Sequence, residues 1–449
     1  MAKSDDRLLI GNGTVITLSA TNRIIERGGV LLRGGVIEDV GPMKTLGRKA
    51  AGARRLDAGG KVIMPGLINA HMHLYSTFAR GLMPKQPPAR TFVEVLERLW
   101  WPLDKALTAR DLESSCLVAL IDGIRNGTTT IIDHHESQGF QEGCLDVIER
   151  TARATGVRSV LCLGVSDRYG KGQEGIDENV RFIRKVRARM AKGDDLVSAM
   201  FGLHALFTVG ERTLQESVRA SRALGAGLHV HVAEDKADEL ANREQYGLSV
   251  VERLHQAGGL GPQTIAVHCV HIGAKDMSLL RRTGTIVVHN PQSNMNNAVG
   301  VARVPDMLAM GLVVGLGTDG MTANMRDEVR VANLLQKLVK KDPRAFFVES
   351  CRLLLEHNAE IASRFFDRPV GALEPGAYGD VIVVDYDPPT PLTSDTFLGH
   401  FLFGLCGARV DSTIVNGRLL MHEGELVGLD ARRLAARSRR QAADFWRRF

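Results

Sequence analysis

The chain has 449 residues, of which 44% are hydrophobic and 24% are charged, which is typical of a globular protein with one large domain and a smaller one. It contains no apolar run of the roughly 20 residues that a membrane span needs, and the first seven residues carry charges without an apolar block behind them. These features predict a cytoplasmic protein, and six scattered cysteines without C-x-x-C pairs argue against a disulfide framework.

The net charge of +6 is concentrated at the C-terminus. The last 19 residues contain seven arginines and one acid, and the remaining chain has 50 basic and 50 acidic residues. A basic tail can touch RNA or a membrane surface. We favour a terminal helix with an apolar face of Leu434, Ala442, Phe445 and Phe449, and we predict neither a nucleic-acid nor a membrane partner.

Short strands separated by glycine turns are predicted at both ends of the chain. Near the N-terminus they cover residues 8–10, 14–18, 30–33 and 36–40, and near the C-terminus 380–386, 412–415 and 418–421. We expect the two ends to meet in one small β domain, formed by residues 1–62 and 366–449 and carrying the C-terminal helix.

Between these ends, apolar runs alternate with segments of helical spacing. Eight candidate strands cover residues 62–68, 128–133, 158–163, 198–204, 227–231, 264–268, 285–289 and 313–318. Eight βα units in about 300 residues are typical of a (β/α)₈ barrel. We therefore predict a TIM-type barrel over residues 63–365, an α/β fold with its active site at the C-terminal ends of the strands.

Two histidines, His71 and His73, follow the first barrel strand in the run P-G-L-I-N-A-H-M-H. Side chains at positions i and i+2 of a strand point the same way, so both imidazoles can face one point. A bare H-x-H is as well explained by core hydrogen bonding as by a metal. The other predicted strands favour a metal site, because ten of the fourteen histidines fall at or near predicted strand ends.

Among these strand-end residues, His71, His73, His231 and Asp319 form a plausible ligand set, because three nitrogens and one carboxylate leave a position for water. His229 also faces inward, but His231 lies nearer the C-terminal end of its strand and is the preferred ligand. Glu234 is a candidate general acid and base, and His268 is either a fourth ligand or a hydrogen-bonding partner.

Several blocks of the chain resemble the amidohydrolase superfamily, in the branch of metal-dependent deaminases and triazine hydrolases. They occur in the family's order: P-G-L-I-N-A-H-M-H, then residues 201–209, 229–235, 267–271, 289–296 and 317–320. In finer detail, R-L-W-W-P-L-D at 98–104 and I-D-H-H at 132–135 resemble the SsnA-type aminohydrolases.

The resemblance implies one divalent metal ion, zinc or iron, held by His71, His73, His231 and Asp319. Glu234 would pass a proton to a ring nitrogen, and His268 would orient the water. His204 resembles a position that contacts the substrate in related deaminases. The resemblance also suggests a homodimer.

The implied reaction is hydrolytic deamination of an amino-substituted nitrogen heterocycle of the purine, pyrimidine or pterin type, with water as the second substrate. One alternative is removal of halide or alkylamine from a triazine-like ring. Another is ring-opening hydrolysis of a cyclic amide, which would need a modified lysine at a strand end, and the predicted strands offer none. A non-catalytic scaffold of this superfamily would be expected to have lost metal ligands, and this chain has lost none of them.

Substrate contacts are expected from loops at the same end of the barrel. The long connection 74–108 carries Trp100 and Trp101 and should form a lid or pocket wall, and residues 166–177 form a possible cover. His134 and Asn294, which follow other strands, are candidate substrate-binding residues together with His204 and Trp100.

Overall fold

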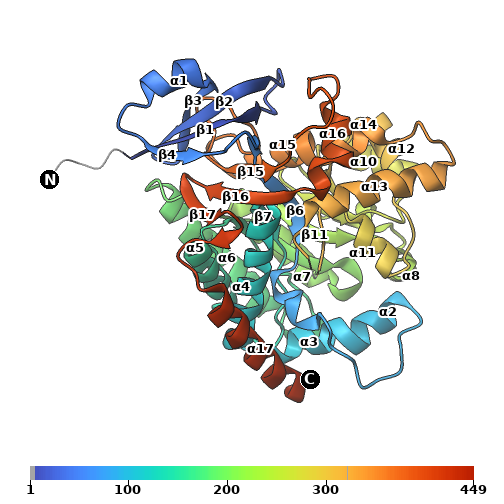
Figure 1. Ribbon diagram of the computed structural model, residues 1–449. Helices are drawn as coiled ribbons and strands as arrows, with labels where there is room; N and C mark the ends of the chain where they lie inside the picture. Colours follow the sequence, from blue (N-terminus) through green and yellow to red (C-terminus); the bar gives the residue numbers. More distant parts are fainter. Residues whose placement is uncertain (1–5, 321) are drawn as a thin grey trace.

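The computed structural model describes residues 6–320 and 322–449. Its strands form a barrel and a separate β-sheet (Figure 1). Eight strand positions, one of them split, surround the barrel axis: β6 (Leu67–Met72), β7 (Thr128–Asp133), β8 (Arg158–Leu161), β9 with β10 (Val197–Ala199, Phe201–Ala205), β11 (Leu228–Val232), β12 (Ile265–His268), β13 (Ile286–His289) and β14 (Val314–Leu316). The predicted (β/α)₈ fold is confirmed.

The barrel closes next to the predicted site. The strands run parallel in two groups, β6 to β9 and β10 to β14. The first and last are joined by a bridge between Met72 and Asp319 and by the backbone amide of Asp319, which donates to the carbonyl of His71 at 3.1 Å. Closure therefore holds the predicted ligands His71 and Asp319 side by side.

Helices surround the barrel and follow most of its strands. The longer ones are α4 (Ala109–Asn126), α5 (Cys144–Thr155), α6 (Gly172–Met190), α7 (Glu211–Ala223), α8 (Lys236–Tyr246), α10 (Ala274–Thr283) and α13 (Met325–Lys340). Several have an apolar face on the barrel core: α4, for example, buries Leu112, Cys116, Ala119 and Leu120 on successive turns. In the described part of the chain, no helix is both long and apolar enough to cross a membrane.

Both chain ends contribute to the second sheet, as predicted. Its strands are β1 (Arg7–Ile16), β2 (Ile24–Arg33), β3 (Val36–Pro42), β4 (Arg54–Asp57), β5 (Val62–Pro65), β15 (Val381–Asp385), β16 (Arg409–Val415), β17 (Arg418–His422) and β18 (Glu425–Leu426). Strand β5 pairs with β1 on one side and with β15 on the other. This pairing joins the N-terminal and C-terminal segments in one sheet.

The predicted strand over residues 62–68 is in fact two strands. Its first half, β5, belongs to the small sheet, and β6 in the barrel begins at Leu67. The chain passes between the sheets at Gly66, where a Cβ atom would lie only 2.1 Å from Oγ1 of Thr129. A glycine is therefore required at this crossing. In the sequence, the pair Pro65–Gly66 marks the break between the two strands.

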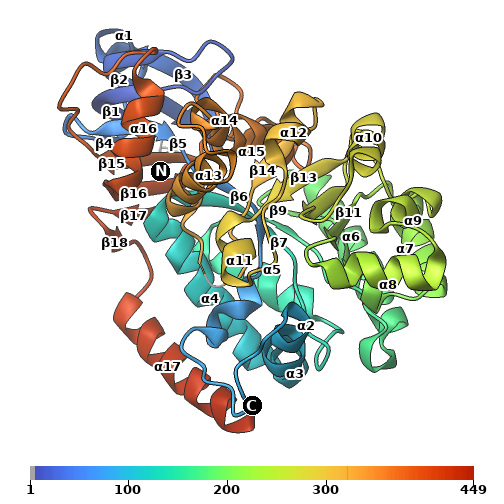
Figure 2. The same ribbon diagram turned by 90° about the vertical axis from the view of Figure 1, so that its right-hand side faces the viewer.

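The C-terminal helix α17 (Ala431–Arg448) has the predicted apolar face but lies on the barrel. It runs beside α4 and away from β1–β3 (Figures 1 and 2). Phe445 is fully buried against Phe78, and the indole Nε1 of Trp446 donates to the carbonyl of Phe78 at 2.8 Å. The domain boundaries proposed from the sequence stay a prediction.

Candidate metal centre and active site

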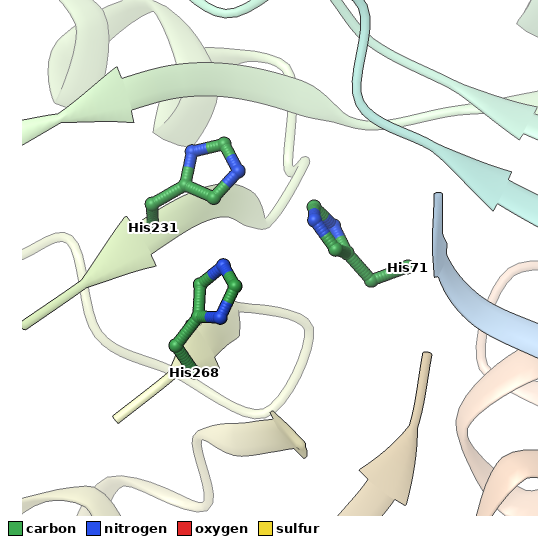
Figure 3. A group of neighbouring side chains, drawn as sticks. All are labelled: His71, His231 and His268. Carbon is green, nitrogen blue, oxygen red and sulfur yellow. The ribbon is translucent and has the colours of Figure 1, made fainter. Parts of the chain in front are cut away.

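The predicted ligands converge at the C-terminal end of the barrel. His71 is part of β6 and His73 follows it, and their ring centroids are 4.8 Å apart. His231 comes from β11, and its Nε2 lies 3.3 Å from Nε2 of His73. Figure 3 shows the rings of His71, His231 and His268 turned toward one another from three strands. The alternating strand pattern thus placed these side chains correctly.

Asp319 and Glu234 complete the group on the loops after β14 and β11. An Asp319 oxygen, Oδ1, lies 3.0 Å from Nε2 of His73 and 3.7 Å from Nε2 of His71. Nε2 of His268 lies 3.4 Å from Oε2 of Glu234 and 3.8 Å from Oδ2 of Asp319. Two carboxylates and three imidazoles therefore face the same small volume.

The second nitrogen of each imidazole is occupied, which fixes the direction of the first. Nδ1 of His73 donates to the carbonyl of His134, and Nδ1 of His231 donates to the carbonyl of His204 at 2.7 Å. Nδ1 of His71 shares a hydrogen bond of 2.9 Å with Nε2 of His229. Since metal-binding histidines are usually oriented by such bonds, each Nε2 is directed at the shared volume.

His268 is oriented in the same way, by Asn294. Its Nδ1 donates to Oδ1 of Asn294 at 2.8 Å, and its Nε2 is buried without a hydrogen-bond partner. Nε2 of His71 is likewise buried and unpartnered. Buried nitrogens without partners are costly, and a bound cation would satisfy both of them.

Left-handed backbone conformations support this arrangement. His268 has a φ of 68° and Asp319 a φ of 60°, which side chains other than glycine rarely adopt. Such strain is maintained only where the surrounding fold enforces it, and it gathers at functional sites.

The donor set fits a divalent metal. Groups of three side chains whose ligand atoms lie within 4.8 Å of one another include His71, His73 and Asp319, and His71, His231 and His268. Nitrogen and carboxylate donors suit zinc, iron, cobalt or manganese. The chain thus offers a candidate site for one of these divalent metal ions.

A cavity of about 250 Å³ opens beside this cluster. It is lined by His73, His231, Glu234 and Asp319 at the metal end. Its walls include an apolar group from the long connection after β6, the segment predicted to form a pocket wall: Phe92, Leu96, Trp100 and Trp101. The connection is ordered as α2 (Phe92–Val95), a π-helical turn (Leu96–Trp100) and α3 (Trp101–Ala106).

The predicted substrate-binding residues divide into two groups. His204 and Trp100 line the cavity. His134 and Asn294 are buried behind it, where Nε2 of His134 donates to the carbonyl of Leu203 at 2.9 Å and Asn294 accepts from His268. The structure therefore brings His204 and Trp100 to the cavity and places the other two as supports of the histidine cluster.

The cavity wall carries two further polar groups. Ser293 donates to Oδ2 of Asp319, and Nδ2 of Asn297 donates to Oε1 of Glu234 at 3.3 Å. The sequence indicates Asn297, which follows the seventh strand, as a candidate amide contact or a turn residue, whereas it does not single out Ser293. Asp104 and Glu136 come from different loops and meet at Arg168, and nothing in the sequence links residues 104, 136 and 168.

Burial and neighbouring charges together give the two carboxyl groups of the centre different proton affinities. Burial raises the pKa of Glu234 to about 7, with His268 opposing the shift and Asp319 adding to it. For Asp319, burial acts in the same direction, but the adjacent imidazoles of His71 and His73 outweigh it and hold the pKa well below its usual range. Two carboxyl groups with separated pKa values suit one proton donor and one proton acceptor.

A family model described as "Amidohydrolase family" matches residues 62–420 of the chain. This chain belongs to the amidohydrolase family. The match covers the whole barrel and extends into the C-terminal β segments, and it confirms the family resemblance seen in the sequence blocks.

Two curated amidohydrolase relatives are similar along almost their whole length. A 5'-deoxyadenosine deaminase of Methanosarcina mazei is 33% identical over 443 residues, which cover 97% of this chain and 98% of the relative. A 5-methylthioadenosine/S-adenosylhomocysteine deaminase of Pelotomaculum thermopropionicum is 31% identical over 442 residues, with the same coverage. Both relatives are named as deaminases.

Solved amidohydrolase structures support the fold. An adenosine deaminase from Xanthomonas campestris with bound zinc has a TM-score of 0.85 at 24% identity and covers 98% of both chains. An atrazine chlorohydrolase from Arthrobacter aurescens complexed with zinc has a TM-score of 0.79 at 21% identity, covering 97% of this chain and 100% of that chain. These similarities establish a common architecture.

Proposed function

We propose that this protein is a metal-dependent deaminase of purine nucleosides that are modified at the 5' position. The observation that carries the proposal is the pairing of Glu234 with Asp319 beside four convergent imidazoles at the end of a cavity. The curated relatives named as 5'-deoxyadenosine and 5-methylthioadenosine/S-adenosylhomocysteine deaminases support this substrate class.

Zinc is the cation we propose for the site, held by His71, His73, His231 and Asp319. The zinc-containing adenosine deaminase structure supports this choice. When bound, such a cation acts as a Lewis acid and brings the pKa of water toward about 7. His268 lies within 4 Å of both carboxylates and is proposed to orient the water molecule.

The side chains supply the proton transfers of a hydrolytic deamination. Asp319, with its depressed pKa, accepts a proton from water as the oxygen attacks the ring carbon that bears the amino group. Glu234, with its pKa raised to about 7, donates a proton to the adjacent ring nitrogen. The carbon–nitrogen bond to the amino group then breaks, and Asp319 returns its proton to the leaving group, which departs as ammonia. As the carbonyl forms, the remaining hydroxyl proton passes to Glu234 and restores its protonated form.

Ammonia release tests this proposal. The zinc-loaded protein should release ammonia from 5'-deoxyadenosine and 5'-methylthioadenosine. Glu234→Gln should lower kcat by at least about 100-fold, as expected for loss of a general acid. The matched control is Glu244→Gln, an exposed position on α8 that should leave turnover unchanged.

Two other outcomes would replace the proposal. Absence of ammonia from these nucleosides, with chloride release from a chlorotriazine, would favour a displacement reaction. Ring opening of a dihydropyrimidine would favour cyclic amide hydrolysis. The ammonia assay also detects deamination of free aminopurines, aminopyrimidines and pterins. A preference for one of these would show that the substrate is a free heterocycle and not a nucleoside.

A further inference from the structure

The cavity is lined by many carboxyl groups. Six of its lining residues carry carboxyl groups, and none of the described lining residues is a lysine or an arginine. Two of the six, Glu234 and Asp319, belong to the catalytic end. The others are Asp104, Glu136, Asp235 and Asp238. An anionic group on a substrate would therefore meet carboxyl groups without a free basic partner.

The nearest guanidinium is already engaged. Arg168 donates from NH1 to Oδ2 of Asp104 at 2.8 Å and from NH2 to Oε2 of Glu136 at 3.0 Å. Its Nε donates to Oγ of Ser166, and its guanidinium lies over the ring of Trp101 at 5.2 Å. The Arg168 side chain is only 9% exposed, so it cannot turn toward a substrate without breaking these contacts.

The two carboxyl groups around Arg168 are themselves almost completely buried. Asp104 and Glu136 are 1% and 2% exposed, and both line the cavity wall. Oδ1 of Asp104 and Oε1 of Glu136 have no hydrogen-bond partner. Because each nitrogen of the Arg168 guanidinium already donates to a neighbour, this corner offers no free basic group to a substrate carboxylate and disfavours it.

We infer that Asp104, Glu136 and Arg168 form a charge filter that admits neutral or cationic 5' substituents of the nucleoside and rejects those that carry a carboxylate. This inference rests on the proposed function and narrows its substrate class. The apolar wall of Phe92, Leu96 and Trp100 agrees with it, because burying an uncharged methylthio or methyl group against this wall is favourable. A homocysteine tail would bring its carboxylate to an acidic wall.

The test compares two nucleosides that differ only in this group. S-adenosylhomocysteine carries a carboxylate and an ammonium group on its tail, and its decarboxylated analogue keeps the chain length and the ammonium group. The zinc-loaded protein should deaminate the decarboxylated analogue with a kcat/KM at least about tenfold higher, a difference of about 1.4 kcal/mol. Methylthioadenosine should also exceed S-adenosylhomocysteine.

The possible results separate the two proposals. Equal kcat/KM values for the matched pair, or a preference for S-adenosylhomocysteine, would overturn the charge filter and leave the deaminase assignment intact. If the protein neither turns over these nucleosides nor binds them in calorimetry, both proposals fall.

A variant locates the effect. Asp104→Asn together with Glu136→Gln removes both carboxylates from Arg168 with little change in side-chain volume. The ratio of kcat/KM for S-adenosylhomocysteine to that for the decarboxylated analogue should then rise by about tenfold. The exposed control Asp177→Asn, on the neighbouring helix α6, should leave the ratio unchanged. An unchanged ratio in the double variant would contradict the assignment, and a general loss of folded protein does not alter a ratio.

Discussion

The ion pair between Arg158 and Asp380 links the barrel to the small β sheet and gives a quantitative test of the architecture. Arg158 lies on β8, and Asp380 immediately precedes β15. Nε of Arg158 donates to Oδ2 of Asp380 at 2.7 Å, and the two side chains are 0% and 1% exposed. Oδ1 of Asp380 also accepts from the backbone amide of Asn416 at 2.8 Å. Asp380→Ala would remove all these contacts and leave a buried guanidinium without its ion-pair partner.

The expected loss follows from this geometry. At a separation of 2.7 Å and an effective dielectric constant of about 20, the attraction is about 6 kcal/mol, which desolvation partly offsets. Loss of one partner from a buried pair typically costs about 3–5 kcal/mol, and this is the decrease in unfolding free energy that we predict for Asp380→Ala. Urea unfolding followed by tryptophan fluorescence measures it.

Two further variants test the reasoning. Glu216→Ala removes one partner of the exposed Arg212–Glu216 pair on α7 and should cost less than about 1 kcal/mol. Arg158→Met combined with Asp380→Leu should recover much of the stability lost in Asp380→Ala, because no charge stays buried. A loss below about 1 kcal/mol for Asp380→Ala, or a double variant less stable than Asp380→Ala, would refute this account.

Three other predictions concern the metal centre and its surroundings. His229→Leu removes the hydrogen-bond partner of Nδ1 of His71 and should weaken zinc affinity by about 10–100-fold, measured by competition with a chelator. An unchanged affinity would assign His229 to packing alone. Asn294→Leu removes the hydrogen-bond acceptor for His268 and should lower kcat by about 10–100-fold with less effect on KM, measured with a 5'-deoxyadenosine substrate series. An effect on KM alone would instead indicate direct contact between Asn294 and the substrate. Burial raises the pKa of Glu328 to about 8, so the folded state keeps its proton while the unfolded state ionises near pH 4.5, and stability should fall as the pH rises between these values. In urea unfolding, Glu328→Gln should flatten this decline, and an equally steep decline would exclude Glu328 as its source.

The barrel and the convergence of the candidate ligands can be predicted from the sequence because both follow from regular patterns. Alternation along a strand puts His71 and His73 on one side, and the position of His231 near its strand end distinguishes it from His229. In the structure, His229 is bonded to His71 and supports it from behind. Parallel strands bring their C-terminal ends together, so His71 and Asp319 can meet although about 250 positions separate them in the sequence.

The cavity wall is less predictable because loops and supporting contacts have no such period. Asp104, Glu136 and Arg168 meet across three connections, and only the folded chain brings them together. Asn294 was predicted to face the substrate, yet its side chain reaches His268 from behind, because it lies on α11 (Pro291–Asn296) and not in an open loop. The break between β5 and β6 was hidden by a continuous apolar run.

The metal content of the purified protein tests the central claim most directly. Elemental analysis should find about one divalent metal ion per chain, most of it lost in a His231→Ala variant that still folds, because three imidazoles and one carboxylate form a single centre. A chain without stoichiometric metal, or one with two ions per chain, would contradict the account.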